Sequence, residues 1–136
     1  MVPAMGNYKA NDVVRFDPKI AKEYLAKTQY ASSPGKLKIV LLTTDKEGAK
    51  LVAEALQAMW KQHLGITVKI EQREWASYQG RKTKLDCGIS TGGWIGDYPD
   101  PTTFLDMWKK GDGNNRTGWS NKKYEDKLQE AATTED

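Results

Sequence analysis

The residue types that could do chemistry are concentrated in one segment, residues 90–101, which reads Ser-Thr-Gly-Gly-Trp-Ile-Gly-Asp-Tyr-Pro-Asp-Pro. Glycines allow a backbone to approach a bound molecule closely. Trp94 can supply an apolar wall, and Asp97 can supply a negative charge. This combination suits a small ligand held by backbone hydrogen bonds, apolar contact and a counter-ion. Glycine pairs and proline-flanked turns also occur where nothing binds, so the residues alone leave a binding loop and a plain turn both open.

Three carboxylates in and after this segment are candidates for a metal site or for glycoside hydrolysis: Asp97, Asp100 and Asp106. Asp106 falls in a predicted helix and Asp100 in a turn between two prolines, so we do not expect the three to form a metal site. A small α/β hydrolytic enzyme that uses Asp97 and Asp100 is an alternative. Against it, the sequence has no GxxxxGK phosphate loop and no HExxH motif.

The chain has one cysteine and one histidine, which the sequence places in different elements. Cys87 lies in an apolar-leaning run and is expected to be a small buried residue, because it has no partner for a disulfide or a CxxC motif. His63 falls near the end of a predicted helix, where a histidine interacts favourably with the helix dipole. We therefore predict no nucleophile–base pair.

The elements that precede the segment predict a parallel sheet. Residues 37–42 form an apolar run typical of a strand covered on both faces, residues 66–71 alternate, and residues 85–90 are a third candidate strand. A strand, helix and strand with short connections form a right-handed crossover between parallel strands. Ligands of such sheets bind at the carboxyl ends of the strands, which is where residues 90–101 begin.

Capping patterns and apolar spacing predict the helices. The crossover helix is expected to begin at a capping box formed by Thr44 and Glu47, and to end near His63, before Gly65. Its predicted buried stripe is Leu51, Val52, Ala55, Leu56 and Met59. Residues 1–16 show no period, and further helices are expected over residues 17–28, 75–82, 102–108 and 121–133. Trp60 and Trp75 are expected in the core.

Composition is that of one globular α/β domain over residues 1–136, with 38% apolar and 29% charged residues. The net charge is +3, and no run of five like charges exists, which argues against a nucleic-acid-binding surface. The longest apolar run, residues 39–42, is far too short to cross a bilayer. The first six residues show no basic region followed by an apolar stretch, so no signal peptide is recognised.

Several motifs, taken in order, resemble the bacterial oligopeptide- and dipeptide-binding proteins of ABC importers, which form family 5 of the extracellular solute-binding proteins. The motifs are residues 60–68 (Trp-Lys-Gln-His-Leu-Gly-Ile-Thr-Val), Glu74-Trp75, residues 93–105 beginning Gly-Trp-Ile-Gly-Asp-Tyr-Pro-Asp-Pro, and Asn115 with residues 120–124. The similarity covers essentially the whole chain, and the shared order of separate motifs is more specific than any single one.

This resemblance implies a periplasmic-binding-protein-like fold of type II, in which two lobes enclose a peptide. The chain is expected to be an internal stretch of the second lobe of a longer protein. The implied function is non-catalytic capture of a peptide outside the cytoplasmic membrane, by a periplasmic protein or a cell-surface lipoprotein, and delivery to ABC permease subunits. No cofactor, metal or nucleic-acid partner is implied. Some relatives carry nickel complexes or sugars, which is the alternative within the family.

The same resemblance assigns the ligand-binding residues. Gly93, Trp94, Ile95 and Asp97 match the stretch that lines the peptide site, and Asp97 would meet the α-ammonium group of the ligand. Some family members place an arginine shortly before the Gly-Trp pair to meet the ligand carboxylate. Here Ser90 and Thr91 stand in that neighbourhood, with Arg81 and Lys82 further back, so the preferred peptide length stays open. An isolated lobe fragment is also expected to expose apolar surface and to self-associate.

Overall fold

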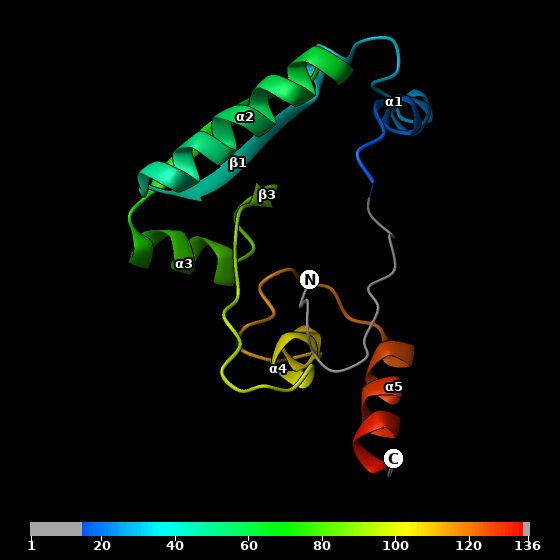
Figure 1. The fold of residues 1–136 in the computed structure, drawn as a ribbon. Coiled ribbons are helices and arrows are strands. Elements are labelled where there is room, and N and C mark those ends of the chain that lie inside the picture. Colours follow the sequence, from blue (N-terminus) through cyan, green and yellow to red (C-terminus); the bar gives the residue numbers. More distant parts are fainter. Residues whose placement is uncertain (1–14, 135–136) are drawn as a thin grey trace. The chain divides into compact units, whose positions relative to one another are not determined.

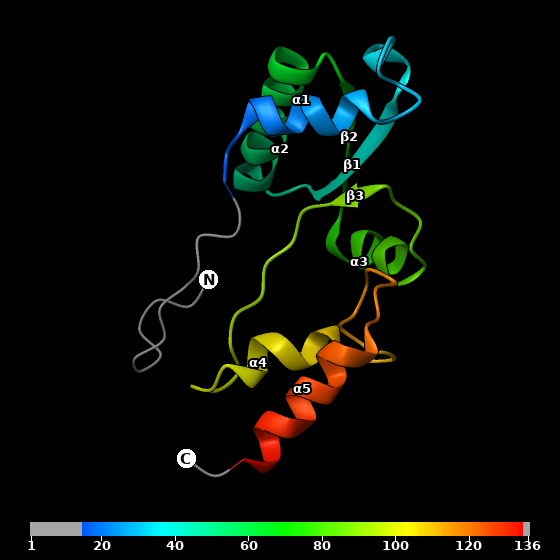
Figure 2. The ribbon, with the colours of Figure 1, turned by 90° about the vertical axis from the view of Figure 1, so that its right-hand side faces the viewer.

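The computed structural model describes residues 15–134, which fall into two compact units. We call residues 15–92 the sheet unit and residues 93–134 the helical unit, and describe each by itself (Figures 1 and 2). The expected single domain over residues 1–136 remains a prediction. Most of the predicted irregular lead-in, residues 1–14, lies outside the described residues.

The sheet unit is built on three parallel strands in the order β2-β1-β3. They are β1 (Lys38–Thr44), β2 (Thr67–Arg73) and β3 (Ile89–Ser90). The predicted parallel crossover is therefore confirmed, with Ile39 opposite Val68. The predicted third strand is too long, because Leu85 has a φ of 54°, a left-handed conformation that interrupts an extended strand.

The crossover helix α2 (Glu47–Leu64) ends as predicted, since Gly65 caps it with a left-handed φ of 69°. The predicted capping box at its start is wrong. Thr44 is a buried residue of β1, paired with Arg73 of β2, and Lys46 precedes the helix without a side-chain cap. The strand runs two residues further than its apolar pattern, so the helix begins at Glu47 itself.

The core lies between α2 and the sheet, and α2 runs along the strands (Figure 1). Its buried members are Leu41, Ala53, Ile66 and Val68, and the partly buried Leu56, Trp60 and Leu64 pack against them. The predicted stripe of α2 is thus only partly right: Leu56 faces the core, but Leu51, Val52 and Met59 are exposed. The helix carries two apolar stripes, and Ala53 lets the second approach the sheet.

Two shorter helices complete the sheet unit. Helix α1 (Pro18–Ala26) lies within the range predicted for it and packs on α2, and Asp17 caps it by accepting hydrogen bonds from the N–H groups of Lys19 and Ile20. Helix α3 (Trp75–Thr83) is also confirmed and contacts β1 and β2. The core position predicted for Trp75 is wrong, because its side chain is 58% exposed and stacks on Tyr78. A short 3-10 turn, η1 (Pro34–Lys36), precedes β1.

Helices and turns make up the helical unit. They are α4 (Thr102–Leu105), the 3-10 turn η2 (Asp106–Trp108) and α5 (Lys122–Thr133), close to the predicted ranges. Asn121 caps α5, and the Tyr124 hydroxyl donates to the Leu105 carbonyl at 2.8 Å, which ties α5 to the end of α4. No helix within residues 15–134 is both long and apolar enough to cross a membrane.

An ion pair joins β2 to α3 and gives a pH-dependent prediction. Arg81 lies 2.6 Å from the Glu71 carboxylate, and Arg73 also contacts it. Hydrogen bonds from Arg81 first, then Arg73, hold the pKa of Glu71 below its ordinary value. Because the folded pKa is depressed, this contribution to stability is present above the ordinary pKa and is lost as pH falls.

Arg81→Gln is expected to raise the pKa of Glu71, measured by NMR titration of its carboxyl carbon. An unchanged pKa would contradict the pairing.

Candidate functional site

The predicted ligand-binding segment begins where the chain leaves the carboxyl end of the sheet. Thr91 still donates a backbone hydrogen bond to the Leu42 carbonyl at 3.0 Å, so the ladder of β1 and β3 reaches this residue. Residues 91–96 then carry neither helix nor strand, and the chain runs on to α4 (Figure 1). From Gly93 onward the segment belongs to the helical unit.

The backbone of Gly93, Trp94 and Ile95 is unpaired. Within residues 15–134, no hydrogen bond to the N–H or C=O groups of these three residues is formed. The Ile95 side chain is 90% exposed, and a Cβ built on Gly93 would meet no atom within 4 Å. Three consecutive residues therefore offer free donors and acceptors, as an unpaired strand edge does.

Asp97 is anchored through its backbone, which leaves its carboxylate free. Its N–H donates to the hydroxyl of the buried Thr103 at 3.0 Å. At Gly96, a Cβ would lie 3.0 Å from the Phe104 ring and 3.1 Å from Thr103, so glycine permits this close approach. The Asp97 side chain is exposed, and its carboxylate has no hydrogen bond or ion pair within the described part of the chain.

The other two candidate carboxylates have partners of their own. Asp100 accepts hydrogen bonds from the Thr102 hydroxyl at 2.6 Å and from its N–H at 2.9 Å, and these bonds, the hydroxyl first, lower the pKa of Asp100. Asp106 pairs with Lys109 at 2.8 Å. Asp100 therefore stays ionised and accepts hydrogen bonds at the start of α4. A carboxylate that stays ionised does not suit the role of a general acid. Over residues 15–134, no group of three or more metal-binding side chains comes together.

Trp94 is half-buried, and its indole N–H is buried without an acceptor. A buried donor without a partner is costly, so the side chain does not sit in a fully satisfied core position. Residues 93–97 thus combine an apolar side chain (Trp94), three residues of unpaired backbone (93–95) and a carboxylate without a partner among the described residues (Asp97). Such a site can bind a molecule that has backbone-like hydrogen-bonding groups and a positive charge.

Comparison with known proteins identifies the family. Residues 1–116 match the sequence profile of the family described as bacterial extracellular solute-binding proteins, family 5, middle region. The chain belongs to this family. The predicted family membership is thereby confirmed.

Individual relatives of this family-5 chain are peptide-binding proteins by name. The oligopeptide-binding protein OppA of Bacillus subtilis is 38% identical over 96% of this chain and 24% of its own length. The structure of the periplasmic oligopeptide-binding protein OppAIV of Borrelia burgdorferi superposes with a TM-score of 0.84 at 28% identity, covering 95% of this chain and 26% of that one. Haemophilus influenzae OppA, in complex with the peptide RPPGFSPFR, gives 0.82 at 29% identity, over 88% and 23% of the two chains.

These matches confirm the predicted fold class, an α/β fragment of the periplasmic-binding-protein type with a parallel sheet and flanking helices. The chain spans about a quarter of the length of these relatives. The assignment of individual site residues in this family-5 chain stays a prediction, as does its place in the second lobe.

The structure adds two polar residues near the carboxyl ends of the strands that the sequence did not single out, Thr43 and Tyr78. The Thr43 and Thr91 hydroxyls are 2.9 Å apart, and the hydroxyl of the buried Tyr78 donates to the Thr91 carbonyl. The Lys82 ammonium group lies 5.1 Å from the centre of the Tyr78 ring. The one available signal was the four-residue spacing of Tyr78 and Lys82, which places them on one face of α3.

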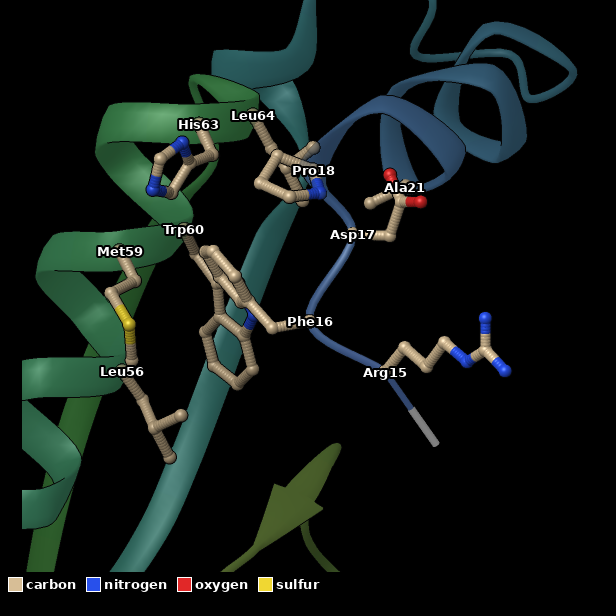
Figure 3. Close-up of a pocket in the computed structure, with 10 residues that line it drawn as sticks. All are labelled: Arg15, Phe16, Asp17, Pro18, Ala21, Leu56, Met59, Trp60, His63 and Leu64. Carbon is tan, nitrogen blue, oxygen red and sulfur yellow. The ribbon is translucent and has the colours of Figure 1, made fainter. Parts of the chain in front are cut away.

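The residues considered for nucleophilic chemistry lie elsewhere in the sheet unit. Cys87 is a half-buried free thiol. His63 contacts Phe16 edge to face, with ring centres 5.5 Å apart, and both line a hollow of about 230 Å³ that also borders on Trp60 and Met59 (Figure 3). This hollow, between α1 and α2, is walled mainly by apolar side chains. Asp17, its one carboxylate, is occupied in capping α1.

Proposed function

We propose that the chain is part of the ligand-binding second lobe of a non-catalytic protein that captures peptides for an ABC importer. The observation that carries this proposal is the Asp97 carboxylate, free and exposed, next to three residues of unpaired backbone. The peptide-binding relatives support it. By the same analogy, the full-length protein works outside the cytoplasmic membrane, in a periplasm or as a cell-surface lipoprotein, and delivers its peptide to permease subunits.

The α-ammonium group of the peptide is the charge that this site must compensate. Closure of two lobes would remove the ammonium from water, and an uncompensated buried charge is costly. The Asp97 carboxylate has no competing partner among residues 15–134, so it can accept charge-assisted hydrogen bonds from the ammonium. This contact fixes which end of the peptide lies at Asp97.

Backbone pairing explains how such a site accepts many sequences. The free N–H and C=O groups of Gly93 and Ile95 pair with the ligand backbone, as when a strand adds to a sheet edge. Main-chain hydrogen bonds do not depend on ligand side chains. Trp94 packs against the first residues of the ligand. A nickel complex or a sugar lacks a peptide backbone with an ammonium end, so these ligands fit the observed groups less well.

An amide NMR titration of the chain with trialanine and with N-acetyl-trialanine tests the proposal. Trialanine is expected to shift the amide signals of Gly93 to Asp97, and acetylation should abolish these shifts because it removes the ammonium charge. Equal shifts with both peptides would contradict the role of Asp97. If neither peptide binds, the titration is repeated on the full-length protein, where failure would contradict the function.

Light scattering on the same sample tests self-association, which we propose from the exposed apolar side chains of α2, such as Leu51 and Val52. Concentration-dependent growth of the particle mass is expected. A monomer at all concentrations would contradict it and would simplify the titration.

A further inference from the structure

Helix α2 has an outer face of five exposed apolar side chains: Leu51, Val52, Ala55, Ala58 and Met59. Leu51 is 61% exposed and Val52 is 54% exposed. Within the sheet unit, no other helix or strand covers the side of α2 that faces away from β1 (Figure 1). The five residues recur at helical spacing, so they form one continuous stripe. A continuous exposed apolar stripe marks a surface that meets another molecule.

The outer face of α2 can pair with a second copy of itself. The helix runs from Glu47 to Leu64, so Ala55 lies near its middle. In an antiparallel pair with the two-fold axis at Ala55, the two helices overlap over nearly their whole length. Leu51 of one copy then meets Met59 of the other, because both lie four residues from Ala55. A two-fold interface requires this kind of self-complementary surface.

The charges of α2 favour the antiparallel direction. Glu47 lies in the first turn, and Lys61 and His63 lie in the last turn. Antiparallel pairing brings the acidic turn of each copy to the basic turn of the other, and the two helix dipoles oppose each other. A parallel pair would instead bring Glu47 to Glu47. Near the middle, Lys50 pairs with Glu54 of the same helix at 3.8 Å, so the centre carries no net charge.

We propose that two copies of this chain associate through the outer face of α2, as an antiparallel helix pair with its two-fold axis at Ala55. The proposal gives the self-association inferred above a defined surface and direction, and it does not depend on peptide capture. One helix pair buries less than the roughly 1,200–2,000 Å² of stable interfaces. The dimer is therefore expected to dissociate on dilution.

A disulfide across the two-fold axis tests the geometry. Residues that face each other in a helix pair with axes about 8–10 Å apart have Cα atoms about 4–6 Å apart, which a disulfide can span. Oxidised glutathione is therefore expected to link Ala55→Cys into a covalent dimer. Ala58→Cys is the matched control on the same face: its two copies lie about 9 Å apart along the helices, too far for a disulfide. Both variants carry Cys87→Ala, which removes the one native thiol.

Reversal of the end charges tests the direction of pairing without a new thiol. Glu47→Lys is expected to raise the dissociation constant of the dimer about 5-fold, because it removes two exposed ion pairs. Lys61→Glu alone should have a similar effect. The double variant should regain the original dissociation constant, since the charges are exchanged and opposite signs meet again. Sedimentation equilibrium measures all four proteins.

Equal disulfide yields from Ala55→Cys and Ala58→Cys would overturn the proposal, because random collision or a parallel pair links both. A monomer at all concentrations would overturn it as well. Slow labelling of the thiol in a monomeric Ala55→Cys would then show that another part of the same chain covers the outer face. If Ala55→Cys does not fold, the charge reversal decides. Every one of these results leaves peptide capture to be judged by the trialanine titration, which is read at Gly93 to Asp97.

Discussion

Asp97→Asn is expected to weaken the binding of trialanine to the full-length protein by about 2–5 kcal/mol, which corresponds to a roughly 30-fold or larger rise in Kd. The substitution keeps the size and shape of the side chain, removes its charge and replaces one acceptor oxygen by an NH2 donor. The Asp97 N–H bond to Thr103 does not involve the side chain, so the loop should keep its conformation. The loss reflects an ammonium group that is enclosed by the lobes without its counter-ion.

A charge-matched control separates this contact from a general field effect. Glu23→Gln also removes one negative charge, but Glu23 is an exposed residue of α1 in the sheet unit. Calorimetry should show no change for Glu23→Gln. N-acetyl-trialanine completes the cycle, since it should bind equally weakly to the unmodified protein and to Asp97→Asn. If Asp97→Asn binds trialanine with unchanged affinity, Asp97 is not the partner of the ammonium.

Local patterns predicted those elements whose ends and faces are decided by neighbouring residues. The apolar run of β1 and the alternation of β2 specify strands, and Gly65 stops α2 because it adopts a left-handed conformation at little cost. Asp17 caps α1 through its own hydrogen bonds. Each of these signals acts within a few residues, so a reading of the sequence can detect it.

Features that depend on tertiary contacts, such as which side chains are buried, were predicted less well. Helix α2 carries apolar residues on two sides, and periodicity does not tell which side meets the sheet. Trp75 is apolar enough for a core, yet Tyr78 takes the buried position on α3, because its hydroxyl can reach the Thr91 carbonyl. Thr44 has the spacing of a cap but lies in β1. In each case, a partner distant in the sequence decided the outcome.

The candidate site likewise contains some residues that local sequence marks and others that only the fold brings together. Residues 93–97 are consecutive, so their unusual types marked them at once. By contrast, Thr43 lies on β1 and Tyr78 lies on α3, and both reach Thr91 only because β1 and β3 are parallel neighbours with α3 beside them. Resemblance to a family carries over the positions of its motifs, and neither Thr43 nor Tyr78 belongs to the motifs that were matched.

Leu41→Ala is expected to lower the free energy of unfolding of the sheet unit by about 2–5 kcal/mol, the usual cost of emptying a buried leucine position. Leu41 lies on the central strand, is 1% exposed and packs with Ala53 and Val68. Because whole domains are stable by only about 5–15 kcal/mol, this loss is a large fraction of the total. Urea unfolding, followed by NMR at the amide signals of β1, measures it.

Leu51→Ala is the matched control, since it deletes the same atoms from a side chain that is 61% exposed on α2. Its effect should stay within about 0.5 kcal/mol. The two variants also show which apolar stripe of α2 packs on the sheet. A large loss of unfolding free energy for Leu51→Ala would mean that the predicted stripe, rather than the face with Ala53, packs there. A small loss for both would mean that the core is not centred on β1. Only the combination of a large effect at Leu41 and a small effect at Leu51 agrees with the structure, because the first side chain is buried and the second is exposed.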